Sequence, residues 1–141
     1  MTSYILNFLI SLLIGSMIFF TAVVSPSVFA TLSSNASSRF LRLVFPRMFL
    51  FGIIITSLCF LLSILLNNNL ASILLAIITL SFFLNRNYLT PRINKYRDEE
   101  LEGNQRAATL FKRMHLISVL LFVLNFVLLI SIMVINYYNY N

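Results

Sequence analysis

The chain has 141 residues, of which 60% are hydrophobic and only 10% are charged, and its formal net charge is +6. A soluble domain carries about 25% charged and about 45 to 50% apolar residues, so this composition excludes a water-soluble globular protein. The basic residues occupy two short stretches between apolar runs. This pattern is typical of the positive-inside bias of membrane proteins and argues against a nucleic-acid partner.

Four apolar runs follow one another along the chain, at about residues 4–30, 48–66, 70–89 and 114–138. A helix that crosses a bilayer needs about 20 residues, and runs one, two and four meet this directly. The third is interrupted by Asn85, Arg86 and Asn87, so Arg86 would have to extend to the lipid headgroups. We predict an all-α, integral membrane four-helix bundle that forms a single membrane domain over residues 1–141.

The distribution of basic residues supports four spans rather than three. Arg39, Arg42 and Arg47 lie between the first two runs, and the other seven basic residues lie from Arg86 to Arg113. Both groups fall on one side of the membrane only if the third run spans it. We therefore predict a bacterial inner-membrane protein with cytoplasmic basic segments and both termini periplasmic. An outer aromatic belt would hold Tyr4, Tyr137, Tyr138 and Tyr140.

An alternative interpretation makes the first run a cleaved signal peptide, because Val28, Phe29 and Ala30 resemble a small-residue cleavage site. No basic residue precedes the apolar run, and export would carry the segment from Arg39 to Arg47 across the membrane. Both features favour an uncleaved span.

Two prolines and one glycine in and beside the connecting segments are expected to interrupt helices. We expect Pro46 to open or kink the second helix and Pro91 to end the third. Gly103 should divide the segment that follows, which carries an acidic stretch from Asp98 to Glu102. An apolar stripe then leads into the fourth run, formed by Ala107, Leu110, Phe111 and Met114. This indicates an amphipathic cytoplasmic elbow on the membrane surface, with a partner-docking helix as the alternative.

Each span shows one small or polar face at helical spacing. These faces comprise Asn7, Ser11, Gly15, Ala22 and Ser25; Gly52, Thr56, Cys59 and Ser63; Ser72, Ala76 and Thr79; and His115, Ser118 and Asn125. Such faces favour close helix packing in lipid without any ligand. The pairs Ser11 with Gly15 and Gly52 with Thr56 could serve packing within a protomer or in a homo-oligomer.

Several polar residues fall at the cytoplasmic ends of their spans and could ring one inner-leaflet pocket: Ser25, Arg47, Asn87, Arg92 and His115. With Ser118 and Asn125 added, the ligand-binding candidates are Arg47, Arg92, His115, Ser118 and Asn125. Arg47 and Arg92 could instead meet lipid phosphates, and a backbone carbonyl or a headgroup could satisfy His115. Asn125 lies about 15 Å further along its helix and must find a partner inside the bundle.

The sequence offers little for catalysis or metal chemistry. Every carboxylate lies between Asp98 and Glu102, which disfavours ion-coupled transport by a carboxylate within the bilayer. Cys59 is the only cysteine, so no intrachain disulfide forms, and no cluster of His, Cys or Met ligands exists. Phosphate-loop, dinucleotide, metalloprotease and nucleophile-elbow motifs are absent. We predict no catalytic residue, no metal and no cofactor.

Three stretches carry a family resemblance: Val44 to Phe49, Thr90 to Arg92, and Phe111 to Ser118 followed by Asn125. They resemble the transmembrane protein 205-like family, whose bacterial members form a domain of unknown function. The resemblance covers about residues 15–129 and implies the same four-span layout. It singles out Phe45, Pro46, Pro91, Arg92, Phe111, His115, Ser118 and Asn125. Thr90 stands where the family often has an acidic residue. The arrangement is also distantly similar to small four-helix membrane proteins of the copper-resistance D and haem-biosynthesis J type.

Three functional hypotheses follow. The leading one is a non-enzymatic bundle that binds a small or lipid-like ligand, or a partner subunit, through its inner-leaflet polar cluster, with membrane lipid around it. The second is a membrane redox protein with His115 as an axial haem ligand, which would need Met, Lys or water as the second ligand. The third is a structural or assembly subunit of a membrane complex.

Overall fold

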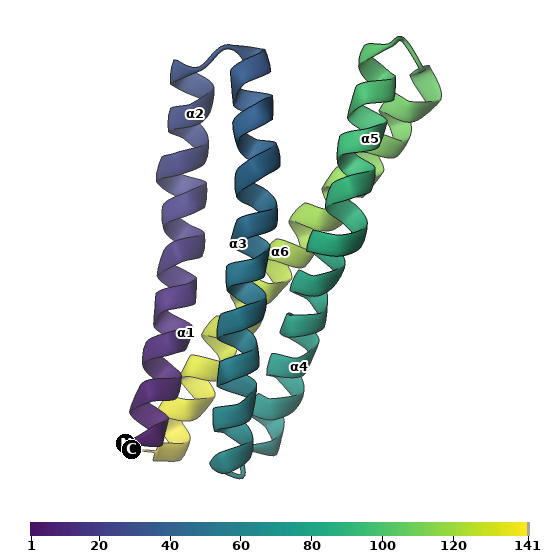
Figure 1. The fold of residues 1–141 in the computed structure, drawn as a ribbon. Coiled ribbons are helices and arrows are strands. Elements are labelled where there is room, and N and C mark those ends of the chain that lie inside the picture. Colours follow the sequence, from purple (N-terminus) through teal and green to yellow (C-terminus); the bar gives the residue numbers. More distant parts are fainter. Residues whose placement is uncertain (141) are drawn as a thin grey trace.

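The computed structural model describes residues 1–140, and the side chains of residues 1–138. The described chain forms four long helical rods that run alternately up and down, with the two termini close together (Figure 1). The rods consist of α1 (Thr2–Phe19), η1 (Phe20–Val24) and α2 (Ser25–Thr31); α3 (Ser34–Leu65); α4 (Asn69–Leu84), η2 (Asn85–Leu89) and α5 (Thr90–Leu101); and α6 (Gln105–Tyr140).

Each rod contains a helix long and apolar enough to cross a membrane, which confirms the predicted four-helix arrangement. The rods are longer than the apolar runs. The second begins at Ser34 rather than near Met48, the third continues to Leu101, and the fourth begins at Gln105. A helix of 30 residues is about 45 Å long, whereas the hydrocarbon core of a bilayer is about 30 Å thick. The additional turns lie at the end of the bundle opposite the termini (Figure 1).

Prolines do not end the rods, so the prediction that Pro91 ends the third helix is wrong. The π-helical turn η2, of five residues, ends just before Pro91, and the π-helical turn η1, also of five residues, ends just before Pro26. Proline lacks an amide hydrogen, and its ring meets the carbonyl four residues earlier, a clash that the wider π turn relieves. The Thr90 hydroxyl also donates to the carbonyl of Asn85 at 2.7 Å. Pro46 lies inside α3 and does not open that helix.

The two turns at the ends of the third rod are well capped. Asn67 adopts φ 54° after α3, and the side chain of Asn68 accepts a hydrogen bond from the Ala71 amide at the start of α4. Gly103 adopts φ 96°, which confirms that it divides the segment before the last helix. The structure does not show the expected surface elbow. Instead, α5 continues the line of α4 and forms a hairpin with the first turns of α6 (Figure 1).

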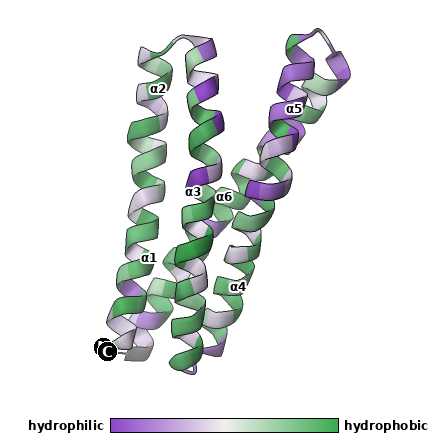
Figure 2. Ribbon diagram, viewed as in Figure 1, coloured by the Kyte–Doolittle hydropathy of each residue, from purple (hydrophilic) through white to green (hydrophobic). Residues whose placement is uncertain are grey.

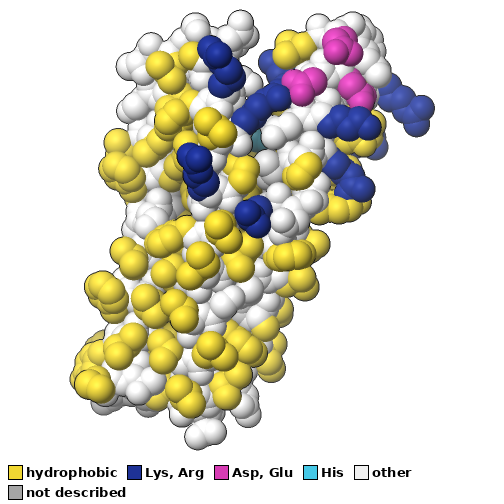
Figure 3. All heavy atoms as spheres, in the orientation of Figure 1, with side chains coloured by type: hydrophobic (Ala, Val, Ile, Leu, Met, Phe, Trp, Pro, Cys, Tyr) yellow, Lys and Arg dark blue, Asp and Glu magenta, His cyan; other side chains and the backbone are white. Residues whose placement is uncertain are grey.

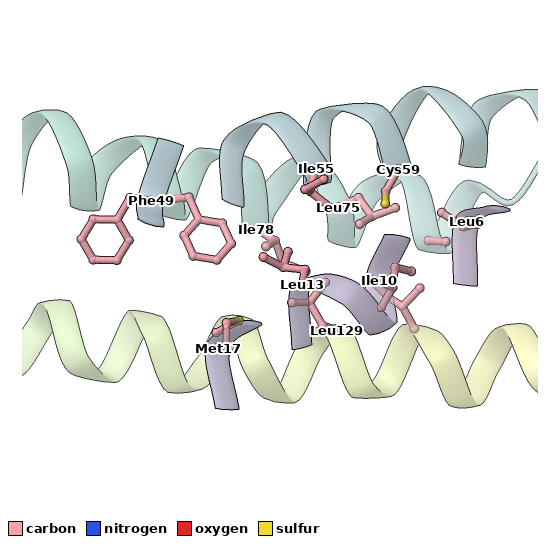
Figure 4. Packing of buried hydrophobic residues seen from close by; sticks show 13 residues of the cluster. Leu6, Ile10, Leu13, Met17, Phe49, Ile55, Cys59, Leu75, Ile78 and Leu129 are labelled. Atoms are coloured by element: carbon pink, nitrogen blue, oxygen red, sulfur yellow. The ribbon is translucent and has the colours of Figure 1, made fainter. Parts of the chain in front are cut away.

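Close packing is concentrated near the end that holds the termini, which we call the terminal end. Buried residues from all four rods interlock there (Figure 4). On the first rod the buried stripe is apolar: Leu6, Ile10, Leu13 and Met17. Ser11, Gly15 and Ala22 are exposed, so the predicted small or polar face of this rod does not pack inward at these three positions, whereas Asn7 contacts Asn136 of α6. Lipid gives apolar side chains no preference for the interior, so either face of such a helix can pack inward.

The predicted face of α3 is buried throughout, at Gly52, Thr56, Cys59 and Ser63. Hydrogen bonds join it to α4: Thr79 to Thr56 at 2.8 Å, and Ser63 with Ser72 at 2.7 Å. Polar pairs in the packed half of the bundle therefore hold α3 against α4.

Candidate functional site

The end opposite the termini carries the charges, and we call it the basic end. Hydrophobic residues predominate along the rods elsewhere (Figure 2), whereas Lys and Arg side chains gather in the half near the α2–α3 and α5–α6 turns (Figure 3). Because both basic segments lie next to these turns, all ten Lys and Arg residues belong to this half.

A cavity of about 940 Å³ lies between the rods at the basic end, lined by residues of α1, η1, α2, α3, α5 and α6. Phe111 and Phe126 both line it, fifteen residues apart on α6, so it extends roughly 22 Å along that helix. Half of the fourteen phenylalanines of the chain contribute to its wall. They are Phe20, Phe29, Phe45, Phe49, Phe111, Phe122 and Phe126.

Polar groups line the part of the cavity nearest the turns. Serines come from α2 and α3, and Asn94, Arg97 and His115 come from the opposite wall. Ser37 is buried, and its hydroxyl lies 3.3 Å from the carbonyl of Val28 and 3.2 Å from that of Leu32, which fixes the α2–α3 turn. The deeper wall is thus mostly aromatic, and most of the polar groups lie toward the mouth, beside Phe29, Leu32 and Phe111.

An ion pair joins the two walls at this mouth. Arg42 of α3 lines the cavity and donates to both carboxylate oxygens of Asp98 on α5, at 2.5 and 3.1 Å. Two parallel bonds of this kind fix the relative orientation of guanidinium and carboxylate. The side chains are 32% and 55% exposed, so solvent and salt screen the pair.

A second arginine is held against the opposite wall. Arg97 donates to Glu100 at 2.6 Å, and its guanidinium carbon lies 5.3 Å from the centre of the Phe111 ring. The Phe111 ring in turn stacks on His115, with ring centres 5.8 Å apart and planes 15° apart. This series of contacts holds the imidazole at the cavity wall.

Two of the five predicted binding residues, His115 and Ser118, line the cavity, as does Ser25. Arg47 does not line it and is exposed. It follows Arg42 by five residues and therefore lies about 140° around the helix from it. The Arg92 guanidinium instead lies over the ring of Tyr88, at 3.4 Å from its centre. Asn87 is exposed and donates to the carbonyl of Phe83.

Asn125 lies inside the bundle, as predicted, with no exposed surface. Among the described side chains, however, neither of its amide atoms has a hydrogen-bond partner, and it does not line the cavity. Tyr140, which the sequence places in an outer aromatic belt, lies outside the described side chains.

Several residues of this region were not predicted as site residues. Asn85 is fully buried and accepts a hydrogen bond from the Ser118 hydroxyl at 2.5 Å, which ties η2 to α6 at the cavity wall. The sequence indicates Arg42 only as part of the positive-inside signal. Its spacing of three and seven residues from Phe45 and Phe49 places all three on one helix face. That spacing is the feature of the sequence that could have predicted an arginine beside aromatic side chains.

The cavity offers a limited set of metal ligands. His115 is the only histidine of the chain, and Met17 also lines the wall. No group of three or more His, Cys, Asp or Glu that could hold a metal ion occurs among residues 1–140. An imidazole and a thioether are together an axial ligand pair that haem accepts.

The fold and the cavity define the class of the protein: a multi-pass membrane protein built as a four-helix bundle, with a cavity open at its basic end. Residues 8–102 match the family described as "Domain of unknown function (DUF4149)", and the chain belongs to this family. No curated protein and no solved structure matches the chain.

Proposed function

We propose that this protein binds a lipid-like ligand, without transforming it, in the cavity at its basic end. The observation that carries the proposal is the cavity itself. Its volume of about 940 Å³ falls within the range of roughly 300 to 1,000 Å³ that is usual for small-molecule sites. Its aromatic depth and polar mouth match a molecule with an apolar chain and a polar head.

The lining residues also support binding rather than catalysis. No carboxylate and no thiol is among the cavity-lining residues of the described chain, so acid–base chemistry would depend on His115 alone. His115 stacks on Phe111 and has no carboxylate to orient it among its described contacts. These features favour recognition of a ligand over its conversion.

We further propose a position in the bacterial inner membrane, with the basic end in the cytoplasm and both termini in the periplasm. The gathering of Lys and Arg at one end supports this orientation through the positive-inside rule. The cavity mouth would then lie near the inner headgroup layer, where a membrane lipid can enter it.

Filling the cavity tests the proposal. Val119 and Val123 line it, whereas their neighbours Leu120 and Leu124, which are exposed to a similar degree, do not. We expect the double variant Val119→Trp with Val123→Trp to lose the lipid that co-purifies with the wild type, measured by native mass spectrometry. The matched control, Leu120→Trp with Leu124→Trp, should retain it. Equal retention by both folded variants would contradict the proposal.

Haem binding is a second candidate function, because His115 lines the cavity and Phe111 holds its imidazole at the wall. When bound, haem would supply one-electron chemistry, and His115 would hold its iron, with Met, Lys or water as the second ligand. The test is the absorption spectrum of protein purified after expression with ample haem, beside a His115→Ala variant. A haem band that the variant loses would make this the leading function, and a colourless folded wild type would eliminate it.

A further inference from the structure

The Arg42–Asp98 ion pair spans the mouth of the cavity. Arg42 belongs to α3 and Asp98 to α5, so the pair joins the rods on opposite sides of the opening. The other two salt bridges of the described chain, Lys95 with Glu99 and Arg97 with Glu100, lie within α5. Arg42 with Asp98 is therefore the one salt bridge of residues 1–140 that crosses between the rods.

Only one partner of this pair faces the cavity. Arg42 lines it, whereas Asp98 does not. The charged side chains of the lining are Arg42 and Arg97, which are both cationic. An apolar chain seated among Phe45, Phe49 and Phe122 would bring its head toward these guanidinium groups, and a guanidinium binds carboxylate or phosphate oxygens with two parallel hydrogen bonds.

We propose that the ligand is an anionic amphiphile, and that its headgroup replaces Asp98 as the partner of Arg42 when it enters. This inference rests on the proposed function. It adds the charge of the ligand's headgroup and the residue, Arg42, that binds it. Asp98 acts as an internal competitor that satisfies Arg42 while the cavity holds no ligand. The exchange leaves Arg42 paired in both states and releases the contact between α3 and α5.

The chain offers matched controls for both members of the pair. Arg39 lies three residues before Arg42 on α3, is exposed and does not line the cavity. Glu102 is exposed at the end of α5, and no salt bridge to it is found within residues 1–140. Arg39→Gln and Glu102→Gln thus change net charge as Arg42→Gln and Asp98→Asn do, without touching the ion pair.

The test uses the full chain in phosphatidylcholine nanodiscs, with stearic acid that carries a nitroxide on its chain as the probe. Electron paramagnetic resonance measures the motionally restricted fraction at a pH that ionises the carboxyl group. The methyl ester of the same probe is the uncharged comparison. We expect the wild type to bind the acid about tenfold more tightly than the ester, the effect of one charge-assisted contact.

Arg42→Gln should remove this preference, and Asp98→Asn should raise the affinity for the acid several-fold while leaving the ester unchanged. The gain in the Asp98→Asn variant cannot come from misfolding. Arg39→Gln and Glu102→Gln should behave as the wild type. Equal loss in Arg39→Gln and Arg42→Gln would overturn the inference, since it would show general attraction to positive charge.

Two further outcomes separate this inference from the proposed function. Equal binding of acid and ester would overturn the headgroup assignment and leave lipid binding intact, whereas binding of neither would overturn both. The last experiment adds acetate or inorganic phosphate as a competitor of the spin-labelled stearic acid. If either anion alone displaces the probe fully, the site recognises a free small anion, and the proposal of an amphiphilic ligand is wrong.

Discussion

Two asparagines of α6, Asn125 and Asn136, show what a buried amide contributes at the residue scale. Both are fully buried. Asn136 donates to Asn7 at 2.9 Å and accepts from Asn68 at 3.1 Å, so its amide ties α6 to α1 and to the turn before α4. Asn125 has no such partner among the described residues. Stability should therefore depend on the amide of Asn136 and not on that of Asn125.

We predict that Asn136→Leu lowers the free energy of unfolding by about 1 to 2 kcal/mol, because it leaves the amides of Asn7 and Asn68 without their partner. Asn125→Leu removes no hydrogen bond within the described chain and should leave stability unchanged or raised. Thermal unfolding of the two variants in the same detergent compares them directly. An equal loss of stability in both would contradict this difference between the two amides.

At the residue scale, the sequence predicted only part of what the structure shows. It predicted that Asn125 lies inside the bundle, because an amide exposed to lipid is costly. It did not predict that Asn136, Asn7 and Asn68 meet, because these residues lie far apart in the chain. Which helix faces oppose one another is decided by packing of all four rods, and no local pattern records it.

At the scale of elements, α3 and α4 pack closely against each other at Gly52. An added Cβ at Gly52 would lie 2.9 Å from the ring atoms Cδ2 and Cε2 of Phe82. Phe82 is buried and lies 6.3 Å from Phe49, ring centre to ring centre, so its ring has little room to move. Gly15, in contrast, has open space around it.

We predict that Gly52→Ala destabilises the protein by about 1 to 3 kcal/mol through overpacking against Phe82. The same substitution at Gly15 should instead stabilise it by up to about 1 kcal/mol, because alanine favours a helix and meets no neighbour there. Melting temperatures of the two variants provide the comparison. Stabilisation by Gly52→Ala would contradict the close approach of α3 and α4.

The number and positions of the spans could be predicted from apolar runs, but their ends could not. Residues 92–101 are mostly polar, yet they continue the third helix. The pairs Lys95 with Glu99 and Arg97 with Glu100, four and three residues apart, support a helix there. The π turn before Pro91 explains the remaining error, because it relieves the clash by which a proline would otherwise break the helix.

At the scale of the whole molecule, the two ends differ in packing and in charge. The terminal end is closely packed and holds the contacts of Asn136 with Asn7 and Asn68, while the basic end holds the cavity, the charges and the Arg42–Asp98 ion pair. Sequence patterns predicted a polar site at this end, with His115 and Ser118 in it. They missed Arg42 and Asp98, because the cavity arises from the way the α5–α6 hairpin and the α2–α3 pair stand relative to each other (Figure 1).

The proposed orientation predicts which turns face each side of the membrane. In a Cys59→Ala background, Asn69→Cys places a thiol at the terminal end and Glu102→Cys places one at the basic end, both at exposed positions. A membrane-impermeant maleimide should label the first variant in spheroplasts, and the second only after the membrane is disrupted. The reverse pattern would place the basic end outside and contradict the orientation.

The most direct test of the central claim locates the ligand. Wild-type protein in phosphatidylcholine nanodiscs is irradiated with a fatty acid that carries a diazirine near the end of its chain, and labelled residues are mapped by peptide mass spectrometry. Lipid binding in the cavity predicts labels on lining residues such as Phe45 and Phe122, lost in the variant with Val119→Trp and Val123→Trp. Labels spread over outward-facing residues such as Leu80 and Leu124, unaffected by that variant, would contradict it.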